Sequence, residues 1–556
     1  MIDLWPHQQE AIDKIAPLGR GMLGMDTGTG KSRVALELLR RWGCRRTLIV
    51  CPLAMVRVWP RELSKHGFDL RALPLDRRST DRRARDMLAA DLCSYVDEQP
   101  FAAILNYQAV IGKALAEALF AIQWDCMILD ESHMAKGPES KASKLLWQLS
   151  AQVTHRVGLT ATILHDKPED AFAQYRIIDP TVFGTDYDAF RRHICVTELE
   201  ELQEKIDRHI ASGIRQITDA QQQGQLALTP SSQRPGLEDK YGRQLVWAIS
   251  TGNWPPQTPQ EEHRLLQTAG GAYIAWRLRK APFMRHAVAR YRNLDDMQAR
   301  MAPITYTCRK RDVLDLPPVL HEERIVTLSP KTRKAYESMR TELRAQVDTG
   351  EIHAGNVLAK SVRLRQIVNG FCTQMRPVLD ENGNETFDAD GKRIEQHETV
   401  EIGTEKRAAL EDFLNGLPAD EPVAVFAIFH HDLDEIHAAA KACGRTSCEL
   451  SGRGRNDLEP WQAGEHNVIA VQCKAGGAGV DFTRACYNVY FGHPWSLGDY
   501  DQTLGRMERY GQTRPMLYLH IIADETVDRD VMDALAAKRS IADVVMNGIG
   551  SQREAA

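Results

Sequence analysis

The residues with the clearest chemical potential lie in the segment DTGTGKS, residues 26–32. Glycines in such a segment let backbone N–H groups close around phosphate oxygens, and the start of a following helix adds positive potential. Lys31 can reach the outer phosphates of a nucleotide, and Ser32 can bind Mg²⁺. The strict eight-residue phosphate-loop pattern is not fully met, because Met25 stands where its first glycine is expected. The segment favours a nucleotide site over a chance glycine turn, and its candidate binding residues are Thr27, Gly28, Thr29, Gly30, Lys31 and Ser32.

An acidic pair, Asp130 and Glu131, follows four apolar residues in CMILDESH. At the end of a buried strand, Asp130 would hold Mg²⁺ through water and Glu131 would polarise the attacking water. Taken alone, an Asp-Glu pair is usually a solvated turn. The apolar run before it and the phosphate loop upstream favour the catalytic interpretation.

Further polar residues could complete such a site. Gln8 in LWPHQQEAI could read the adenine edge, since one amide can donate and accept at once, although alone it would be an ordinary polar helix start. Thr160 and Thr162 in GLTAT lie at the end of another expected strand, where they could sense the acidic pair or could be ordinary β-branched strand residues.

Near the other end of the chain, DQTLGRMERYGQ places Gln502, Arg506 and Arg509 at i, i+4 and i+7. We predict a helix here with the three side chains on one stripe, a capping box at Ser496 and Asp499, and an end at Gly511. The alternative is a solvated surface stripe. A guanidinium delivered from a second lobe to a γ-phosphate raises hydrolysis by roughly 10³ to 10⁵-fold. The candidate catalytic residues are therefore Lys31, Glu131, Arg506 and Arg509.

Composition sets broad limits on the class of protein. The 556 residues are 43% hydrophobic and 26% charged, which is typical of a globular chain with several cores. The N-terminus lacks a basic, apolar signal sequence and the apolar run VAVFAIF is too short to span a bilayer, so we expect a cytoplasmic protein. The 11 cysteines include no CxxC, which argues against metal and disulfide frameworks. A net charge of -5 excludes a uniformly basic nucleic-acid coat but leaves room for a local basic cleft.

Short apolar runs followed by turns and helical patterns recur in two blocks, which is typical of parallel α/β layers. The first block comprises GMLGM, TLIVCP, FAAILNY, CMILD and HRVGLT, within residues 20–160. The second comprises PVAVFAIF, NVIAVQ, ACYNVYFG and PMLYLHII, within residues 422–522. We therefore predict two α/β lobes.

The stretch between the blocks differs in pattern. The pattern predicts helices at ELEELQEKIDRHI and SPKTRKAYESMRTELRAQV and a mobile loop at QQQGQLALTPSSQRPG. It predicts small β-hairpins at the Asn-Gly and Asp-Gly dipeptides after residue 376. The expected domains are an N-terminal lobe at 1–190, a helical and loop insertion at 191–300, a helical linker with hairpins at 301–400, a C-terminal lobe at 401–546 and a disordered tail at 547–556.

In this order the motifs resemble those of superfamily-two helicase motors, and most closely the Swi/Snf-type DNA translocases. The blocks that carry the resemblance, which leaves out about residues 195–295, are LWPHQ, DTGTGKS, LIVCPLAMVRVWPREL, LDESHMAKGPESKAS, RVGLTATIL, CRKRDVLDLPPV, VRLRQIVNG, CKAGGAGVDFTRA and HPWSLGDYDQTLGRMERYGQTR. The last of them, with CRKRDVLDLPP and LRQI, separates the chain from the DEAD-box RNA helicases.

The resemblance implies an α/β fold of two RecA-like parallel-sheet lobes, with a helical insertion region and small β-hairpins between them. It implies ATP and Mg as cofactors, adenine contact by Gln8, metal contact by Ser32 and Asp130, and the finger role for Arg506 and Arg509. It also implies that ATP and DNA are coupled through Thr160, Thr162, Gly477, Gly479 and Gln502. Departures from the family pattern are Ser132, Ile163 and Asp481; the last two put the tightness of coupling in doubt.

Such motors grip one strand of a duplex by its phosphates. Pro52, Trp59, Lys136 and Trp495 match family positions near the DNA groove or the lobe interface. The basic stretch at 71–85 is interleaved with aspartates and is more simply a solvated helix face, whereas TYTCRKR could be structural or could contact DNA. The residues that could contact DNA are Lys136, Arg309, Lys310, Arg311 and Trp495.

The leading hypothesis is an ATP-dependent translocase on double-stranded DNA, in a compact bacterial or phage form. A strand-separating helicase that acts on single-stranded DNA or RNA is the first alternative. The second is an ATP-gated scaffold that binds nucleic acid and turns over poorly, which Ile163 and Asp481 motivate.

Overall fold

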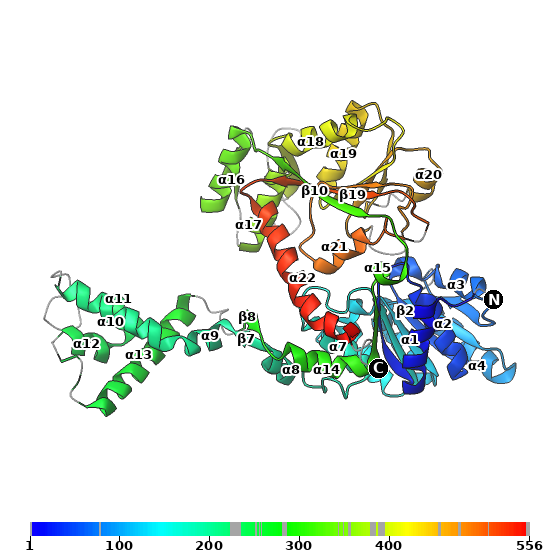
Figure 1. Ribbon diagram of the computed structural model, residues 1–556, viewed down its shortest axis with the longest axis horizontal. Coiled ribbons are helices and arrows are strands. Elements are labelled where there is room, and N and C mark those ends of the chain that lie inside the picture. Colours follow the sequence, from blue (N-terminus) through cyan, green and yellow to red (C-terminus); the bar gives the residue numbers. More distant parts are fainter. Residues whose placement is uncertain are drawn as a thin grey trace. The chain divides into compact units, whose positions relative to one another are not determined.

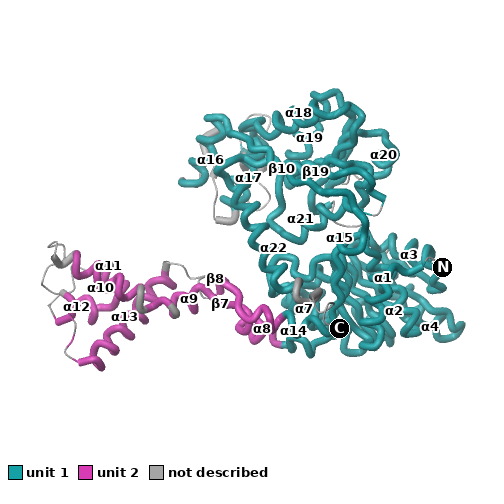
Figure 2. Tube along the Cα trace, viewed as in Figure 1, with its two compact units in different colours: residues 1–185, 298–556 teal, residues 186–297 magenta. Residues whose placement is uncertain are grey.

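The fold is described from a computed structural model (Figure 1). The structure describes residues 3–76, 79–222, 235–250, 253–254, 256, 258–280, 286–342, 344–347, 350–353, 357–378, 385–386, 395–453, 457–475, 480–509 and 511–551. The chain divides into two compact units, residues 186–297 and the remainder (Figure 2). Both large sheets belong to the larger unit.

The N-terminal lobe is built on a seven-stranded parallel sheet. Its order is β3 (Arg71–Pro74), β4 (Phe101–Asn106), β2 (Arg46–Cys51), β5 (Cys126–Asp130), β6 (His155–Thr160), β1 (Arg20–Met25) and β9 (Thr305–Cys308). The five apolar runs predicted as strands are all present, and helices cover a sheet of this kind on both faces, which explains why β5 is buried along its whole length. The helices of this lobe are α1 (Pro6–Ile15), α2 (Lys31–Trp42), α3 (Trp59–Lys65), α4 (Thr80–Val96), α5 (Lys113–Ala121), α6 (Lys141–Ser150) and α7 (Asp170–Ile178).

The C-terminal lobe repeats this plan with a six-stranded parallel sheet. Its order is β10 (Val319–Val326), β19 (Met516–Ala523), β18 (Tyr487–Tyr490), β15 (Val423–Ala427), β17 (Val468–Gln472) and β16 (Ser447–Leu450). The helices around it are α18 (Glu405–Asn415), α19 (His430–Ala442), α20 (Leu458–Gln462), α21 (Leu497–Leu504) and α22 (Val527–Ser551). The predicted fold class of two parallel-sheet α/β lobes is confirmed.

Both sheets contain edge strands that the sequence patterns did not reveal. The edge strand β9 pairs with β1, although it lies almost 300 residues further along the chain. Similarly, β10 pairs with β19 over eight residues, from Val319 opposite Met516 to Val326 opposite Ala523. TYTC is polar at alternate positions and VLHEERIV contains four consecutive polar residues, because an edge strand needs fewer apolar residues than a central one.

The segment between the lobes contains α16 (Pro330–Glu342), α17 (Val357–Val368) and two antiparallel strand pairs. The pairs are β11 (Arg344–Val347) with β12 (Gly350–His353), and β13 (Phe371–Pro377) with β14 (Glu395–Glu401). The predicted helix through residue 347 is therefore wrong at its end, since residues 344–347 form a strand. The Asn-Gly and Asp-Gly turns lie outside the described residues.

Residues 186–297 form the smaller unit, which begins with α8 (Tyr187–Ile194). The short strands β7 (Cys195–Thr197) and β8 (Val288–Tyr291) pair antiparallel. Beyond them lie α9 (Glu198–Glu204), α10 (Ile206–Gln222), α11 (Pro235–Tyr241), α12 (Arg243–Ser250) and α13 (Pro259–Lys280). These helices enclose a small core that includes Ile217, Tyr241 and Val246. Most of the polar stretch predicted as a loop lies outside the described residues.

The last helix, α22, packs against β19 of the C-terminal sheet and also against β9 of the N-terminal one. It extends to Ser551, past residue 546, where the sequence pattern placed the end of the lobe. Within the part of the chain that the structure describes, no helix is both long enough and apolar enough to span a membrane.

A chain of hydrogen-bonded histidines in the C-terminal lobe makes its stability depend on pH. His520 Nδ1 lies 3.0 Å from His493 Nε2, both side chains are almost fully buried, and His520 Nε2 lies 3.2 Å from His321 Nδ1. Burial, and secondarily His321, lowers the pKa of His520 to about 3, and burial lowers that of His493 well below its usual value. The folded lobe therefore holds both imidazoles neutral.

We expect these two histidines to leave the free energy of unfolding unchanged above pH 6.5 and to lower it below that pH, because they bind protons in the unfolded chain and not in the folded one. Each of the two contributes a slope of up to about 1.4 kcal/mol per pH unit between pH 6.5 and its lowered pKa. Urea unfolding at pH 7.5, 6.5 and 5.5 measures this slope. A His520→Gln variant should show a shallower slope below pH 6.5, and an equal slope in both proteins would contradict the assignment.

Candidate active site

The loop between β1 and α2 is shaped for phosphate. Gly28 and Gly30 have φ values of 86° and 88°, a region that favours glycine. A Cβ on Gly30 would also lie 2.2 Å from Gln8 Nε2, so a side chain is excluded there. Gly30 begins α2 without any side-chain cap, which leaves the N–H groups of the first helical turn available to an anion. The loop therefore has a shape that fits phosphate oxygens, and the assignment of its residues to a nucleotide stays a prediction.

Lys31 and α1 fix the shape of this loop. Lys31 Nζ donates to the carbonyl oxygens of Met25 at 2.7 Å and Asp26 at 3.0 Å, partners that a phosphate can replace. Burial lowers the pKa of Lys31, while Glu131 and the neighbouring aspartates act in the opposite direction. Gln8 Nε2 donates to Thr29 O at 3.2 Å, and His7 Nε2 lies 2.9 Å from the same oxygen. His7 is a loop contact that the sequence analysis did not identify.

The acidic pair lies at the end of β5, which is separated from β1 only by β6. Asp130 is 5% exposed, and its Oδ2 accepts a hydrogen bond from Trp59 Nε1 at 2.9 Å. Burial, and next the charge of Glu131, raises the pKa of Asp130 to about 7, although Trp59 and Lys31 lower it. A divalent cation beside Asp130 would favour the charged carboxylate and lower this pKa.

Glu131 is held in an unusual backbone conformation. Its φ is 50°, in the left-handed region, where a non-glycine residue is strained. Its Oε2 is buried without a hydrogen bond from the described residues and lies 3.4 Å from His133 Nδ1. An unengaged carboxylate oxygen of this kind can accept a proton from a water molecule.

The predicted arginines come from the C-terminal lobe, but not from a helix stripe. The Ser496 cap is confirmed, since its Oγ accepts from Asp499 N at 3.2 Å. However, α21 ends at Leu504, so the prediction of a helix to Gly511 is wrong. Gly505 weakens the helix there, and the carbonyl of Arg506 is bonded by Phe482 N at 3.2 Å instead of by a later helical N–H. Arg506 and Arg509 therefore lie in the turns that follow α21.

These turns reach the phosphate loop. Thr27 Oγ1 donates to Gly505 O at 3.1 Å, and a Cβ on Gly28 would lie 3.6 Å from Arg509 Cγ. Arg506 is only 2% exposed, yet its Nε and Nη2 have no hydrogen-bond partner among the described residues, and neither has Arg509 Nε. Burial, then Arg509, lowers the pKa of Arg506 to about 10, with Glu131 acting in the opposite direction.

Buried guanidinium donors without partners are costly, and an anion would satisfy them. Together with the phosphate loop and the acidic pair, they fit a nucleoside triphosphate with a divalent cation. Lys31 and the arginines would bind phosphate oxygens, and Ser32, the second residue of α2, would hold the cation with Asp130. This cation would supply charge neutralisation of the phosphates.

The predicted coupling residues are joined by a histidine that the sequence analysis did not identify. His133 Nδ1 lies 3.2 Å from Thr160 Oγ1, and His133 Nε2 lies 3.3 Å from Gln502 Nε2 of the C-terminal lobe. Thr162 N donates to Thr160 Oγ1 at 3.0 Å. Thr160 and Gln502 are thus linked through one imidazole beside Glu131. Gly477 and Gly479 lie outside the described residues.

The N-terminus of α21 docks on the N-terminal lobe through His165 and Asp166, which the sequence analysis also did not identify. Gly498 N donates to His165 O at 2.8 Å, and Leu497 N to Asp166 Oδ1 at 3.1 Å. Ser496 Oγ lies 2.9 Å from His165 Nε2. The first lobe therefore satisfies N–H groups at the start of the helix that leads to the arginines.

The residues that could contact DNA are mostly engaged within the protein. Lys136 donates to Asp166 Oδ2 at 2.7 Å, and Lys310 is 8% exposed and pairs with Glu508 at 2.5 Å. Arg309 pairs with Asp543 of α22 at 3.3 Å. Arg311, on the short helix α15 (Lys310–Val313), is exposed, and Trp495 is half-buried. The geometry thus gives structural partners to Lys136, Arg309 and Lys310.

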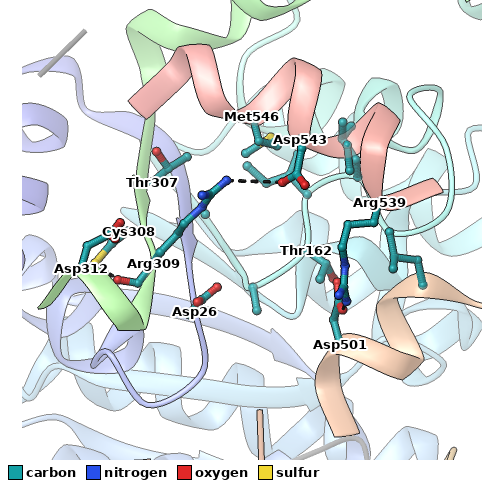
Figure 3. Close-up of a pocket in the computed structure, with 16 residues that line it drawn as sticks. Asp26, Thr162, Thr307, Cys308, Arg309, Asp312, Asp501, Arg539, Asp543 and Met546 are labelled. Atoms are coloured by element: carbon teal, nitrogen blue, oxygen red, sulfur yellow. Dashed lines mark hydrogen bonds and ion pairs between the residues drawn. The ribbon is translucent and has the colours of Figure 1, made fainter. Parts of the chain in front are cut away.

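A cavity of about 540 Å³ lies between α22 and the coupling segment, the stretch at 160–163 that contains Thr160 and Thr162 (Figure 3). Thr162 and Ile163 line it from the N-terminal lobe, and Arg539 of α22 pairs there with Asp501 of α21. Figure 3 shows Arg309 extending toward Asp543 on the other side. Ion pairs of α22 thus connect it with α21 and with the segment that follows β9.

The three residues that depart from the family pattern make defined contacts in the structure. Ile163 is buried, and its Cδ1 would lie 2.9 Å from a Cβ on Gly24. Asp481 Oδ1 accepts hydrogen bonds from Thr483 N and Oγ1 at 2.8 and 2.7 Å, and its charge raises the pKa of Arg506. Ser132 Oγ donates to Gln174 Oε1 at 2.7 Å. All three departures therefore leave the phosphate loop, residues 26–32, intact.

Comparisons with known proteins agree with this geometry. The SNF2-related domain matches residues 10–221, and the helicase conserved C-terminal domain matches residues 405–511. Protein p41 of Acyrthosiphon pisum secondary endosymbiont phage 1 is 27% identical over 255 residues, 45% of this chain and 50% of that protein. RNA polymerase-associated protein RapA of Pseudomonas syringae pv. syringae (strain B728a) is 27% identical over 252 residues, 44% of this chain and 24% of RapA.

Among solved structures, the Sulfolobus solfataricus SWI2/SNF2 ATPase core in complex with dsDNA is 18% identical, covers 98% of this chain and 94% of its own, and has a TM-score of 0.36. The chain spans about half the length of the phage relative and about a quarter of RapA. The SNF2-related and helicase C-terminal domain matches indicate an ATPase, built here on two parallel-sheet α/β lobes. The chain belongs to the SNF2-related, Swi/Snf-type family of superfamily-two helicase-like ATPases.

We expect Arg506→Ala to lower kcat for ATP hydrolysis by roughly 10³ to 10⁵-fold, because a guanidinium opposite the phosphate loop stabilises the charge of the transition state. Binding of a fluorescent ADP should change little, since the charge is needed most in the transition state. Arg514→Ala is the matched control, because that guanidinium already pairs with Glu421 at 3.0 Å. Equal activity in the two variants would contradict the role of Arg506.

Gly498→Ala should block docking of α21, because a Cβ at residue 498 would lie 1.8 Å from His165 Nδ1. We expect the kcat for ATP hydrolysis to fall by at least about tenfold, since misplacing catalytic groups by 1 Å can cost roughly 100-fold. Urea unfolding should be little affected, because each sheet keeps its core. Gly416→Ala is a control for adding a methyl group elsewhere in the lobe, because Gly416 has a φ of -75° and an added Cβ would lie no closer than 3.4 Å to another residue. Retention of full activity by Gly498→Ala would refute the docking role.

Proposed function

We propose that this ATPase couples hydrolysis to translocation on double-stranded DNA and thereby remodels DNA or protein–DNA complexes. The observation that carries the proposal is the buried Arg506 of the C-terminal lobe, whose Nε and Nη2 have no hydrogen-bond partner among the described residues, together with the partly buried Arg509 beside the phosphate loop of the N-terminal lobe. Such a site is complete only when the lobes are closed, so each hydrolysis cycle can drive a change in their arrangement.

The chemical roles follow from the contacts. Lys31 leaves its carbonyl partners to bind phosphate oxygens, and the loop N–H groups orient them. Glu131 Oε2, to which no described residue donates a hydrogen bond, accepts a proton from the attacking water. Arg506 and Arg509 stabilise the charge that develops on the transferred phosphoryl group. We assign Mg²⁺ as the cation held by Ser32 and Asp130, because hydroxyl and carboxylate oxygens suit it.

His133 provides a route from this chemistry to the lobe interface. It contacts Glu131, Thr160 and Gln502. Loss of the γ-phosphate and release of the arginines would therefore change the contacts of the threonines in the coupling segment. Movement of one lobe along a DNA strand would then accompany opening and closing, with the grip made through phosphates and independent of sequence.

The nature of the nucleic acid is supported by the motif set. CRKRDVLDLPP, LRQI and the long last block resemble duplex translocases rather than DEAD-box helicases. A strand-separating helicase on DNA or RNA remains the alternative, and an ATP-gated scaffold would require that Ile163 or Asp481 impair turnover. The relatives include a phage protein and bacterial proteins named for association with RNA polymerase, which supports action in the cytoplasm of a bacterial or phage-infected cell.

We expect duplex DNA to raise the ATPase rate several-fold, and single-stranded DNA or RNA to have much smaller effects. The binding of duplex DNA should weaken with salt, because phosphate contacts release counterions. Steady-state ATPase assays with the three nucleic acids, and Glu131→Gln as the inactive control, measure this. Stimulation by single strands alone would favour strand separation, and an unchanged rate with duplex DNA would exclude the translocase.

A further inference from the structure

Trp59 makes a contact that the family resemblance does not assign to it. It is the first residue of α3, is 1% exposed, and its indole Nε1 donates to Asp130 Oδ2 at 2.9 Å. From its position in the sequence we expected Trp59 near the DNA groove or the lobe interface. Its ring instead belongs to the core of the N-terminal lobe, where it packs with residues of β2 and α2.

The topology of the sheet explains why this indole meets this carboxylate. β2 lies between β4 and β5, and all three run parallel, so the segments that follow them emerge at one edge. Trp59 comes from the segment after β2, and Tyr107 is the residue that follows β4. Tyr107 is 2% exposed, and its hydroxyl donates to the backbone carbonyl of Asp130 at 2.9 Å. Donors that follow two neighbouring strands therefore fix the side chain and the backbone of Asp130.

The chemistry of the donor matters for a residue that must hold a cation. An indole N–H donates one hydrogen bond, carries no charge and cannot accept. It can therefore fix the orientation of the carboxylate without neutralising its charge, whereas a lysine or arginine in the same place would compete with the cation. The charged carboxylate would then remain available to a metal-bound water. Partners of this kind, one layer behind a metal ligand, set the orientation of that ligand and its affinity for the metal.

We propose that Trp59 is a positioning residue that holds the Asp130 carboxylate toward the divalent cation of the bound nucleotide, and that Tyr107 assists it by fixing the backbone of Asp130. The inference rests on the proposed role of Asp130 as a metal contact. It assigns to Trp59 a task in nucleotide chemistry and none in nucleic-acid binding.

The test compares Trp59→Phe with Trp124→Phe in the full-length chain. Trp124 is an equally buried indole in the same lobe, its Nε1 donates to Leu119 O at 2.9 Å, and it precedes the opposite end of β5 from Asp130. Both substitutions delete one buried indole hydrogen bond, so urea unfolding should report similar losses of stability. The readouts are Mg²⁺ titrations of fluorescent mant-ADP bound to each protein, and the Mg²⁺ dependence of the ATPase rate.

For Trp59→Phe we expect the half-saturating Mg²⁺ concentration to rise roughly tenfold in both titrations, in line with the loss of a partner behind a metal ligand. Binding of mant-ADP without metal should be unchanged, and saturating Mg²⁺ should restore most of kcat. Trp124→Phe should match the unaltered protein. A Mg²⁺ dependence of Trp59→Phe equal to that of Trp124→Phe would overturn the inference.

Tyr107→Phe is a second variant for the case in which Trp59→Phe does not fold, because it removes only an oxygen. It should shift the Mg²⁺ dependence in the same direction by a smaller factor, and the absence of any shift would count against the proposal. If the unaltered protein bound mant-ADP with no response to Mg²⁺, the proposed function itself would fail. If the unaltered protein responded to Mg²⁺ but the two tryptophan variants behaved alike, only the role of Trp59 would fail.

Discussion

Concentrated positive charge at the boundary of the two lobes is the constraint on which the site depends. Burial is the main cause that lowers the pKa of Lys31 and of Arg506. Repulsion adds to it, from Arg506 on Lys31 and from Arg509 on Arg506. Glu131 and Asp481 offset this repulsion in part. A triphosphate would offset it far more completely, since a buried charge is stable only when it is paired. Nucleotide binding and closure of the lobes are therefore expected to be one thermodynamic event.

The remaining contacts at the boundary are neutral or compensated. The imidazole of His133 joins Thr160 to Gln502, and burial lowers its pKa to about 4, so it stays neutral at physiological pH. Asp166 binds the start of α21 and also pairs with Lys136. Burial alone would raise the pKa of Asp166, but the bond from Lys136 and nearby charges bring it to about 2. A neutral group such as His133 can be separated from its partners at little electrostatic cost, whereas the nearly buried pair of Lys310 and Glu508 opposes separation of the lobes.

Much of this arrangement could be predicted from sequence, and the exceptions have physical reasons. The central strands, the phosphate loop and the acidic pair are local patterns of burial and spacing, so they were recognised. The edge strands β9 and β10 are too polar for such a pattern. The end of α21 at Leu504 depends on a tertiary hydrogen bond between Phe482 and Arg506, which spacing cannot reveal. His133, His165 and Trp59 carry no signature of their own, because their roles arise from contacts with distant residues.

The late position of β9 has a consequence for synthesis of the chain. The first sheet needs residues 305–308 to cover the open side of β1, and residues 186–297, which fold as a separate unit, are translated before them. While the ribosome makes that unit, the exposed edge of β1 is a site for pairing with other chains. The first lobe is thus expected to finish folding only after more than half of the polypeptide has emerged, and it could need protection by a chaperone until then.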